Sequence, residues 1–304
     1  MRVCHTLAFA ICCAVPVIMR AADPHHGQTF KASGVSLYYE VIGSGEGTPL
    51  IVANGGPGFD HTYLHLSDAW DTIGKSRRVV MYDQRGNGRS SPIASGVSCT
   101  LRDQIEDLEA VRAHIGAERM DLLGHSWGGF LVMAYAARYP QHIEHLMIVD
   151  SAAPKWSDTV FLFKDVFPEG VEREDAAAFA AQMGDQNAAK SAVREYLSML
   201  FYSPERRDAA MAKMTDVDEN HEVNQAIGRD LRNYDLNPEL PKFHFPTVVM
   251  TGRYDMNVAP VVAYKIHRAI SGSTFVVFDR SGHMPFYEEP DKFVQTVQQF
   301  LSGQ

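Results

Sequence analysis

Three residues able to perform nucleophilic hydrolysis follow one another in the order serine, aspartate, histidine. Ser126 stands between glycines in the motif G-H-S-W-G, and Asp255 and His283 come later. A serine hydroxyl is a weak nucleophile until a base takes its proton, and a carboxylate commonly orients that base. The sequence therefore predicts a catalytic triad of Ser126, His283 and Asp255. Asp279 is a weaker candidate for the acid, because it lies only four residues before His283.

Such a reaction also needs N–H groups that stabilise a developing oxyanion. The N–H of Trp127 follows the serine directly, at the expected start of a helix. A second glycine-rich segment, N-G-G-P-G at residues 54–58, follows an apolar run at 50–53. We expect Gly56 and Trp127 to be the two donors, with Gly55 as the alternative to Gly56.

These residues follow short apolar segments that are typical of buried parallel strands. Helical spacings of apolar residues lie between most of the segments. The alternation predicts an α/β fold with a mostly parallel, doubly wound sheet, in which ligands bind at the carboxyl ends of the strands. The expected strands cover residues 35–41, 50–53, 79–82, 120–123, 146–149, 247–250 and 274–278, with a turn at 43–47, and the expected helices cover 101–115, 128–139, 260–270 and 291–301.

One long segment departs from this alternation. Residues 152–240 contain no convincing strand and are rich in Ala, Met, Glu and Asp at helical spacings. We expect a helical cap at 152–240, inserted into a core formed by residues 30–151 and 241–304.

The N-terminus has the composition of a secretory signal. Arg2 and His5 precede an apolar stretch from Leu7 to Met19, and small residues follow. We expect a signal peptide at residues 1–22, export to the periplasm or the medium, and no stable membrane insertion after processing. Three of the four cysteines lie in this segment, so only Cys99 remains and no internal disulfide can form.

Composition and charge exclude other classes of protein. The 304 residues are 45% apolar and carry a formal net charge of −9, which argues against disorder and against nucleic-acid binding. His61 and His65 are spaced four residues apart, but no nearby carboxylate completes a metal-site pattern. We expect no metal and no cofactor.

With these motifs and D-Q-R-G-N-G-R-S at residues 83–90, the chain resembles an α/β-hydrolase of the proline iminopeptidase family of serine peptidases. The motifs N-G-G-P-G and G-H-S-W-G-G resemble that family's H-G-G-P-G and G-x-S-W-G-[GS]. The resemblance implies the triad and oxyanion donors named above, and implies that Asp83 and Arg85 brace loops. Asn54 replaces the family's usual histidine, which supports the loop.

The resemblance also implies release of an N-terminal residue, often proline, from short peptides. Acidic cap residues bind the substrate's free amine in that family, and residues 218–224 hold an acidic cluster here. Glu222 is the first candidate and Glu219 the second. The substrate is a small peptide or an ester, because an esterase or lactonase would share the same triad. A non-catalytic ligand-binding protein on this fold is a further alternative, and the sequence specifies no oligomeric state.

Overall fold

The computed structural model describes residues 27–303 except 33, 216 and 218. The expected signal peptide at 1–22 therefore lies outside the described residues. Among the residues that are described, no helix is long and apolar enough to cross a membrane.

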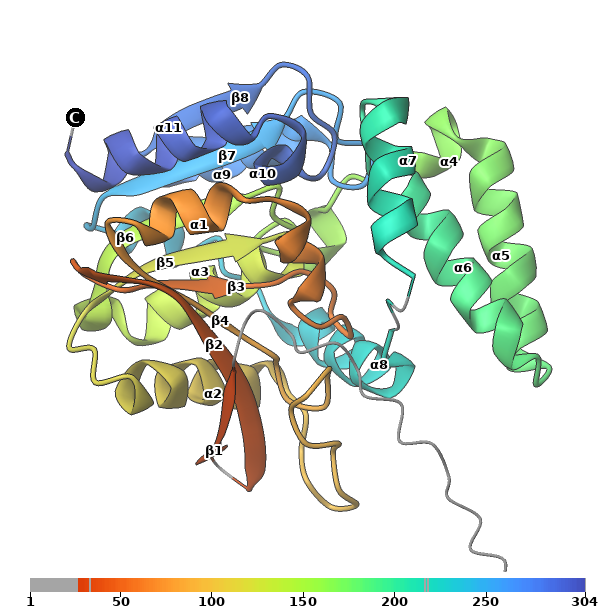
Figure 1. Cartoon of the computed structure of the whole chain (residues 1–304), viewed down its shortest axis with the longest axis horizontal. Helices are drawn as coiled ribbons and strands as arrows, with labels where there is room; N and C mark the ends of the chain where they lie inside the picture. Colours follow the sequence, from red (N-terminus) through yellow and green to blue (C-terminus); the bar gives the residue numbers. More distant parts are fainter. Residues whose placement is uncertain (1–26, 33, 216, 218, 304) are drawn as a thin grey trace, which may run out of the picture.

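Eight strands form one sheet in the order β1-β2-β4-β3-β5-β6-β7-β8 (Figure 1). β1 and β2 are antiparallel to their neighbours, and β3 to β8 all run parallel to one another. The prediction of a mostly parallel α/β sheet is confirmed. The strands are β1 (Gln28–Ala32), β2 (Val35–Glu46), β3 (Leu50–Ala53), β4 (Arg77–Tyr82), β5 (Met120–His125), β6 (Ile143–Val149), β7 (Thr247–Gly252) and β8 (Thr274–Phe278).

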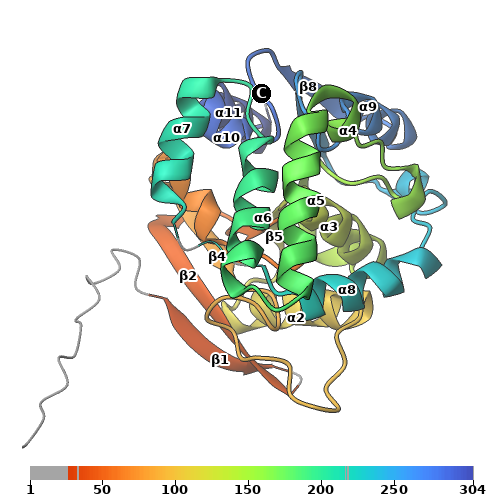
Figure 2. The ribbon, with the colours of Figure 1, turned by 90° about the vertical axis from the view of Figure 1, so that its right-hand side faces the viewer.

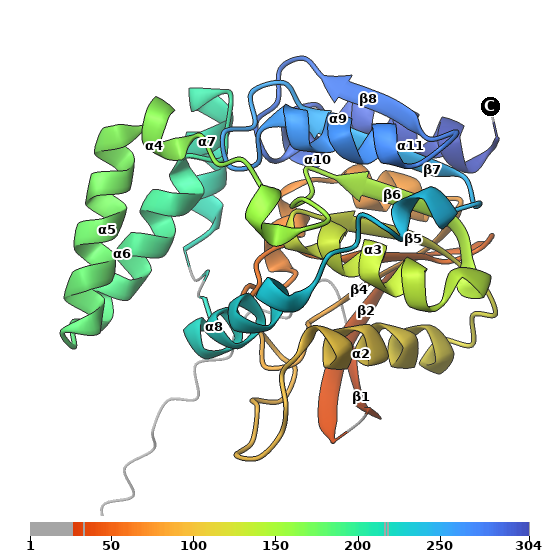
Figure 3. The ribbon, with the colours of Figure 1, turned by 180° about the vertical axis from the view of Figure 1, so that it is seen from behind.

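Helices cover both faces of the sheet and bury its apolar residues. One face carries α2 (Leu101–His114), α3 (Trp127–Arg138) and α9 (Pro260–Ala269), which Figure 3 shows in front of the strands. The opposite face carries α1 (Ala69–Gly74), α10 (Pro285–Glu288) and α11 (Pro290–Leu301). Central strands such as β3 and β5 have no exposed residue, because both of their faces are covered.

The expected turn at residues 43–47 is wrong, because β2 continues to Glu46. The strand's register shifts between Ile42 and Glu46, and Gly43 has a φ of 78°. A Cβ on Gly43 would lie 2.0 Å from the carbonyl oxygen of Gly74. The glycines therefore let an irregular strand pass close to the end of α1, instead of reversing the chain.

Residues 152–240 contain helices and no strand where they are described. We call this segment the helical cap. Figures 1 and 2 show α5, α6 and α7 beyond one end of the sheet. Its helices are η3 (Trp156–Asp158), α4 (Phe163–Val166), α5 (Pro168–Gln182), α6 (Gln186–Ser198), α7 (Pro204–Lys213), α8 (His221–Asp230), η4 (Leu231–Asn233) and η5 (Leu240–Lys242).

Candidate active site

Ser126 occupies a sharp turn between β5 and α3. Its φ of 57° and ψ of −121° are unusual for a residue with a side chain, and Ser126 N–H donates to the carbonyl of Val149 at 2.9 Å. A Cβ on Gly124 would lie 2.2 Å from the carbonyl oxygen of Gly128, so the turn requires glycine there. This strand–turn–helix geometry is that of a nucleophile elbow.

The structure brings Asp255 and His283 together at the same edge of the sheet. Asp255 follows β7, and His283 follows β8. Nδ1 of His283 lies 2.7 Å from Oδ2 of Asp255, and both side chains are buried. The other carboxylate oxygen, Oδ1, accepts the N–H groups of Asn257 and Val258 at 2.9 Å each. The carboxylate is therefore fixed, and it orients the imidazole.

Ser126 and His283 line one small apolar cavity, together with Gly55 and Gly56. The amide Nδ2 of Asn257 lies 3.1 Å from Nε2 of His283. In the part of the chain that the structure describes, the Ser126 hydroxyl has no hydrogen-bond partner. The side chains of Ser126 and His283 thus line the same cavity. The Asn257 amide lies at Nε2 of His283, the position that the serine hydroxyl would need.

A second carboxyl group, that of Asp150, belongs to the same cluster. Asp150 follows β6 with a φ of 45°, and its Oδ1 accepts the Gly252 N–H at 2.8 Å. Ligand atoms of Asp150, Asp255 and His283 lie within 4.8 Å of one another. Burial and the neighbouring charge of Asp255 raise the pKa of Asp150 well above its usual range. Asp150 was not among the site residues that the sequence predicted.

The loop after β3 contains Gly56, an expected oxyanion donor, and Gly55, its alternative. The Gly55 N–H donates to the hydroxyl of Tyr63 at 2.6 Å, so it is not available to a substrate. Within residues 27–303, the gaps at 33, 216 and 218 aside, the N–H groups of Gly56 and Trp127 donate to no protein acceptor. This difference favours Gly56 over the alternative, Gly55.

Asn54 holds this loop in shape from inside the protein. Its Nδ2 donates to the carbonyls of Phe59 and Gly55 at 2.9 Å each. Gln84 donates to the Asn54 carbonyl at 2.9 Å and accepts the Trp127 indole N–H at 2.8 Å. Asn54 therefore supports the loop and does not line the cavities beside Ser126. Gln84 connects this loop to Trp127, which follows Ser126.

Asp83 and Arg85 are buried and brace neighbouring segments, as the resemblance implies. Asp83 accepts the Arg89 N–H at 2.7 Å. Arg85 forms a two-pronged ion pair with Asp107, with N–O distances of 2.6 and 2.7 Å, and donates to the Ser98 carbonyl at 2.8 Å. Neither side chain lines the cavity beside Ser126.

The expectation that no carboxylate completes a metal-site pattern with His61 and His65 is wrong. Glu40, far away in sequence on β2, places its Oε2 3.3 Å from His61 Nε2 and its Oε1 2.5 Å from His65 Nε2. Asp83 lies 2.6 Å from His61 Nδ1. These side chains form a buried charge cluster, and ligand atoms of Glu40, His61 and His65 lie within 4.8 Å of one another.

The electrostatics of this cluster are those of an imidazolium between carboxylates. Burial alone would lower the pKa of His61, but hydrogen bonds and charges from Asp83 and Glu40 raise it to about 10. Burial would raise the pKa of Glu40, but His61 and His65 lower it to about 2. The charges of Glu40, His61 and Asp83 are thus paired within the protein. The absence of a metal stays a prediction.

A cavity of about 640 Å³ opens above Ser126, between the sheet edge and the helical cap. Gly56, Ser126 and Trp127 form part of its lining. Aromatic side chains from both sides of the cavity form an apolar wall: Phe59, Trp156, Phe161, Phe163 and Tyr196. The cavity is large enough for a substrate of two or three small residues.

Two cap carboxylates, Glu174 and Glu219, line this cavity. Burial, followed by the charges of Asp175, Glu219 and Glu195, raises the pKa of Glu174 to about 7. Sequence reasoning missed Glu174, because nothing in the helical pattern of α5 separates it from its solvent-exposed neighbours. Glu219, the second candidate, lies at the cavity, and Asn224 beside it donates to the carbonyl of Pro57 at 3.1 Å.

Glu222, the first candidate, lies in the first turn of α8, where it is exposed and does not line the cavity. The physical reason is the Asn220 N-cap, whose side chain accepts the N–H groups of Glu222 and Val223. This cap starts the helix with Val223 buried and Glu222 on the solvent side. Asp218, the first acidic residue of the cluster, lies outside the described residues.

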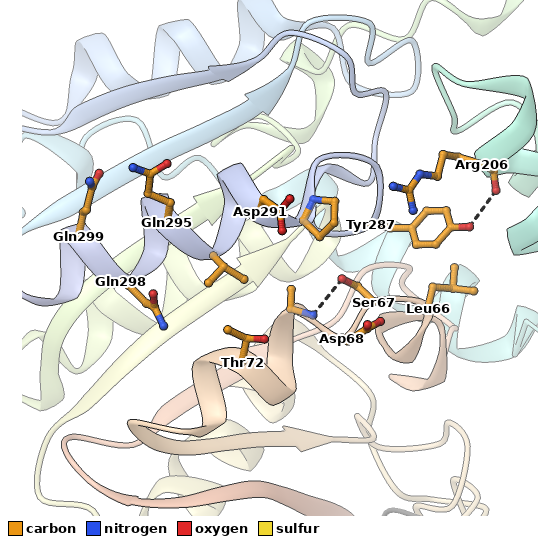
Figure 4. Close-up of a pocket in the computed structure, with 13 residues that line it drawn as sticks. Leu66, Ser67, Asp68, Thr72, Arg206, Tyr287, Asp291, Gln295, Gln298 and Gln299 are labelled. Carbon is orange, nitrogen blue, oxygen red and sulfur yellow. Dashed lines mark hydrogen bonds between the residues drawn. The ribbon is translucent and has the colours of Figure 1, made fainter.

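A separate groove of about 390 Å³ lies between α1 and α11 (Figure 4). Polar side chains such as Gln295, Gln298 and Thr72 line it, and the Tyr287 hydroxyl donates to the Arg206 carbonyl at 3.0 Å. The groove contains no member of the candidate triad.

Comparison with known proteins gives consistent results. The family model described as alpha/beta hydrolase fold matches residues 48–290. A proline iminopeptidase of Lactobacillus helveticus is 30% identical over 88% of this chain and 95% of its own length. A proline iminopeptidase of Clostridium botulinum is 30% identical over 87% of this chain and 94% of its own.

Solved structures share the fold. An enol-lactonase from Burkholderia xenovorans superposes with a TM-score of 0.71 at 23% identity, covering 90% of this chain and 100% of that chain. An esterase from Exiguobacterium antarcticum gives a TM-score of 0.71 at 24% identity, covering 91% and 100%. The sheet, the sequence relatives and the matched family model together show that this chain belongs to the alpha/beta-hydrolase fold family and, within it, to the proline iminopeptidase-like family.

Proposed function

We propose that this protein is a serine aminopeptidase that releases an N-terminal residue of the proline type from short peptides. One observation carries the proposal: the carboxylates of Glu174 and Glu219 line the same cavity as Ser126. A substrate with a free amine would place its ammonium group beside these carboxylates and its first carbonyl at the serine. The proline iminopeptidase relatives support the same activity.

The chemistry proceeds through an acyl-enzyme. Ser126 Oγ attacks the carbonyl carbon while Nε2 of His283 accepts its proton, and the C–N bond breaks as His283 returns that proton to the leaving amine. Water then hydrolyses the ester on Ser126 by the same proton transfers. Asp255, which accepts from Nδ1, keeps the ring in the tautomer whose Nε2 can act as the base.

The N–H groups of Gly56 and Trp127 stabilise the negative oxygen of each tetrahedral intermediate. Removing one such donor typically slows an enzyme by about 10²–10³-fold. Before attack, the Asn257 amide at Nε2 must give way to the serine hydroxyl. The histidine must also be uncharged to accept a proton, so kcat/KM should fall in acid.

The carboxylates would give the site its requirement for a free amine. An ammonium group bound by a carboxylate contributes about 1.5–3 kcal/mol, which corresponds to roughly 10–100-fold in affinity. Burial, and then the charges of Asp175, Glu219 and Glu195, raise the pKa of Glu174, and a bound cation would offset both effects. An acylated N-terminus would lose this interaction.

An esterase or lactonase is the second candidate. The aromatic wall formed by Trp156, Phe161 and Phe163 favours it, because these side chains would bind an apolar acyl group that has no charge. The esterase and lactonase among the similar structures share the fold of this chain. The triad serves both reactions, so substrate preference must decide between them.

The test compares prolyl arylamide with cyclopentanecarbonyl arylamide, which has the same ring without the amine, and with a short-chain aryl ester. We expect kcat/KM for the prolyl arylamide to exceed that for the cyclopentanecarbonyl arylamide by at least about tenfold. The double variant Glu174→Gln, Glu219→Gln should reduce that preference and leave hydrolysis of the cyclopentane compound unchanged.

Equal hydrolysis of the two amides, with the ester strongly preferred, would contradict the peptidase and establish the esterase. Labelling of wild-type protein, but not of Ser126→Ala, by a fluorophosphonate probe separates both enzymes from a non-catalytic binding protein.

A further inference from the structure

Tyr63 and His125 connect the loops around Ser126 through a chain of buried hydrogen bonds. The Gly55 N–H donates to Oη of Tyr63 at 2.6 Å, and Oη lies 2.7 Å from Nδ1 of His125. At the other side of the ring, Nε2 of His125 lies 2.7 Å from the backbone carbonyl oxygen of His283. The chain thus runs from the oxyanion loop, through the residue preceding the nucleophile, to the loop of the catalytic base.

Chemistry fixes the direction of each hydrogen bond. A carbonyl oxygen only accepts, so Nε2 of His125 carries the proton and donates a hydrogen bond to the carbonyl oxygen of His283. Nδ1 of His125 then has the lone pair, so the Tyr63 hydroxyl donates to it. The Tyr63 oxygen accepts from Gly55. Each donor has one acceptor, and His125 is neutral with a single tautomer.

The surroundings keep this chain from rearranging. His125 and Tyr63 are buried, and the ring of Phe286 packs edge-on against His125 with centroids 5.2 Å apart. A Cβ on Gly55 would lie 3.0 Å from Cβ of Ser126 and 3.1 Å from Tyr63 Oη. Burial, and then the neighbouring His283, lower the pKa of His125 well below its usual range, which agrees with a neutral ring.

We propose that Tyr63 and His125 are positioning residues that hold the oxyanion loop and the His283 loop at a fixed spacing around Ser126. Because Tyr63 takes the Gly55 N–H, the next N–H, that of Gly56, remains for the substrate oxygen. Because His125 holds the carbonyl of His283, the backbone that carries the base cannot drift from the serine. This role rests on the proposed acyl transfer, in which displacements near 1 Å can cost about 10²-fold in rate.

These hydrogen bonds require that the side chain at position 125 has one donor and one acceptor, at opposite sides. A glutamine amide meets this demand, whereas leucine fills similar space with neither group. We therefore expect His125→Gln to keep kcat within about fivefold of wild type, and His125→Leu to reduce kcat by about 10–100-fold. Tyr63→Phe should also reduce kcat by about 10–100-fold with KM changed less than threefold, because Tyr63 does not line the cavity of about 640 Å³ above Ser126.

The two residues should also behave as one unit. Tyr63→Phe, His125→Leu together should reduce kcat about as much as either change alone, since each one breaks the same connection. Tyr264→Phe is the matched control, because Tyr264 is half exposed on α9 and takes no part in these hydrogen bonds. Near-ultraviolet circular dichroism checks that each variant is folded.

A pH profile separates positioning from proton transfer. The titratable groups that face His125 are Tyr63 of η1 (Thr62–Leu66) and His283. If His125 stays neutral, the profile of kcat/KM for His125→Gln overlays that of wild type. A shifted acid limb in this variant overturns the proposal, and so does a loss in His125→Gln as large as in His125→Leu.

Failure of the proposed function has a different signature. If Ser126→Ala retains full hydrolysis, the acyl-enzyme is wrong. If Ser126→Ala is inactive while folded Tyr63→Phe and His125→Leu retain wild-type kcat, only the positioning role is wrong.

Discussion

The amide of Asn257 lies 3.1 Å from Nε2 of His283, the atom that must accept the proton of Ser126. Nδ1 of the same ring faces the Asp255 carboxylate at 2.7 Å and carries the ring proton. The two contacts fix the orientation of the imidazole ring. The ring of the candidate base is therefore oriented before substrate binds. For attack, the Asn257 amide must move away from Nε2 so that the Ser126 hydroxyl can reach this atom.

Ser126→Ala should abolish turnover without unfolding the protein. The change removes the attacking oxygen, while the elbow keeps its backbone hydrogen bonds to Val149 and Gly129. We expect kcat for prolyl arylamide to fall by about 10⁴–10⁶-fold, with the circular dichroism spectrum unchanged. Ser157→Ala, at an exposed serine of the helical cap, is the control. Retained turnover in purified Ser126→Ala would assign the nucleophile elsewhere.

Asp150→Asn should be almost silent, in contrast to Asp255→Asn. Burial and the charge of Asp255 raise the pKa of Asp150, which disfavours its ionised form. An asparagine would keep a side-chain oxygen to accept the Gly252 N–H. Asparagine also tolerates the positive φ at this position. We expect kcat of Asp150→Asn within about threefold of wild type, and a loss of about 10⁴-fold for Asp255→Asn.

The pH dependence of kcat/KM on the acid side checks whether the Asp150 carboxyl group carries a charge. An ionised Asp150 would favour the imidazolium, so its replacement by a neutral amide would extend activity to lower pH. An unchanged limb agrees with a protonated Asp150. A limb displaced to lower pH shows that the carboxyl group carries charge beside the triad.

The sequence predicted the parts of the site whose positions follow from strand ends. Gly56, Ser126, Asp255 and His283 each follow one of the parallel strands, and the carboxyl ends of parallel strands meet at one edge of the sheet. Periodicity also located the central strands and the helices beside them. Local glycine patterns were less informative near β2, where Gly43 serves a close backbone contact and not a turn.

The sequence could not predict contacts between residues on elements that are far apart. Glu40 meets His61 and His65 only because β2 lies beside β4 in the sheet and the loop after β3 packs over them. Glu174 meets Glu219 only through the packing of cap helices, which leaves no periodic signal in either segment. Glu222 was the stronger candidate in sequence, but the Asn220 cap turns that position to solvent.

His61→Gln should strongly destabilise the protein. It leaves Glu40 and Asp83 buried without their shared cation, and breaking a buried ion pair costs about 3–5 kcal/mol. For a chain of this size, that loss corresponds to a decrease in Tm of roughly 6–20 °C. Differential scanning calorimetry measures it, with His244→Gln at an exposed site as the control.

The stability of wild type should depend on pH in a way that this variant lacks. Because the pKa of His61 is raised from 6.5 to about 10, its contribution is complete below pH 6.5 and is lost as pH rises through 10. Glu40, whose pKa is lowered to about 2, contributes above pH 4.5 and loses this contribution as pH falls through 2. EDTA should leave Tm unchanged; a decrease with EDTA that zinc reverses would instead identify Glu40, His61 and His65 as metal ligands.

Glu174→Gln should remove a pH dependence from substrate binding. Since the pKa of Glu174 is raised to about 7, the carboxylate is mostly protonated at pH 6 and mostly ionised at pH 8. An ammonium group binds only the ionised form, so KM of wild type for prolyl arylamide should decrease by up to about tenfold between these pH values. The variant should show a high KM that is flat over the same range.

Two controls isolate the charge pairing in that experiment. Glu172→Gln changes a neighbouring carboxylate on α5 that is exposed and does not line the cavity, so it should keep the wild-type pH dependence. Cyclopentanecarbonyl arylamide has no amine, so its KM should not follow the ionisation of Glu174. If its KM decreases with pH as steeply as that of the prolyl compound, the titrating group acts on the cavity as a whole and Glu174 does not bind the substrate amine.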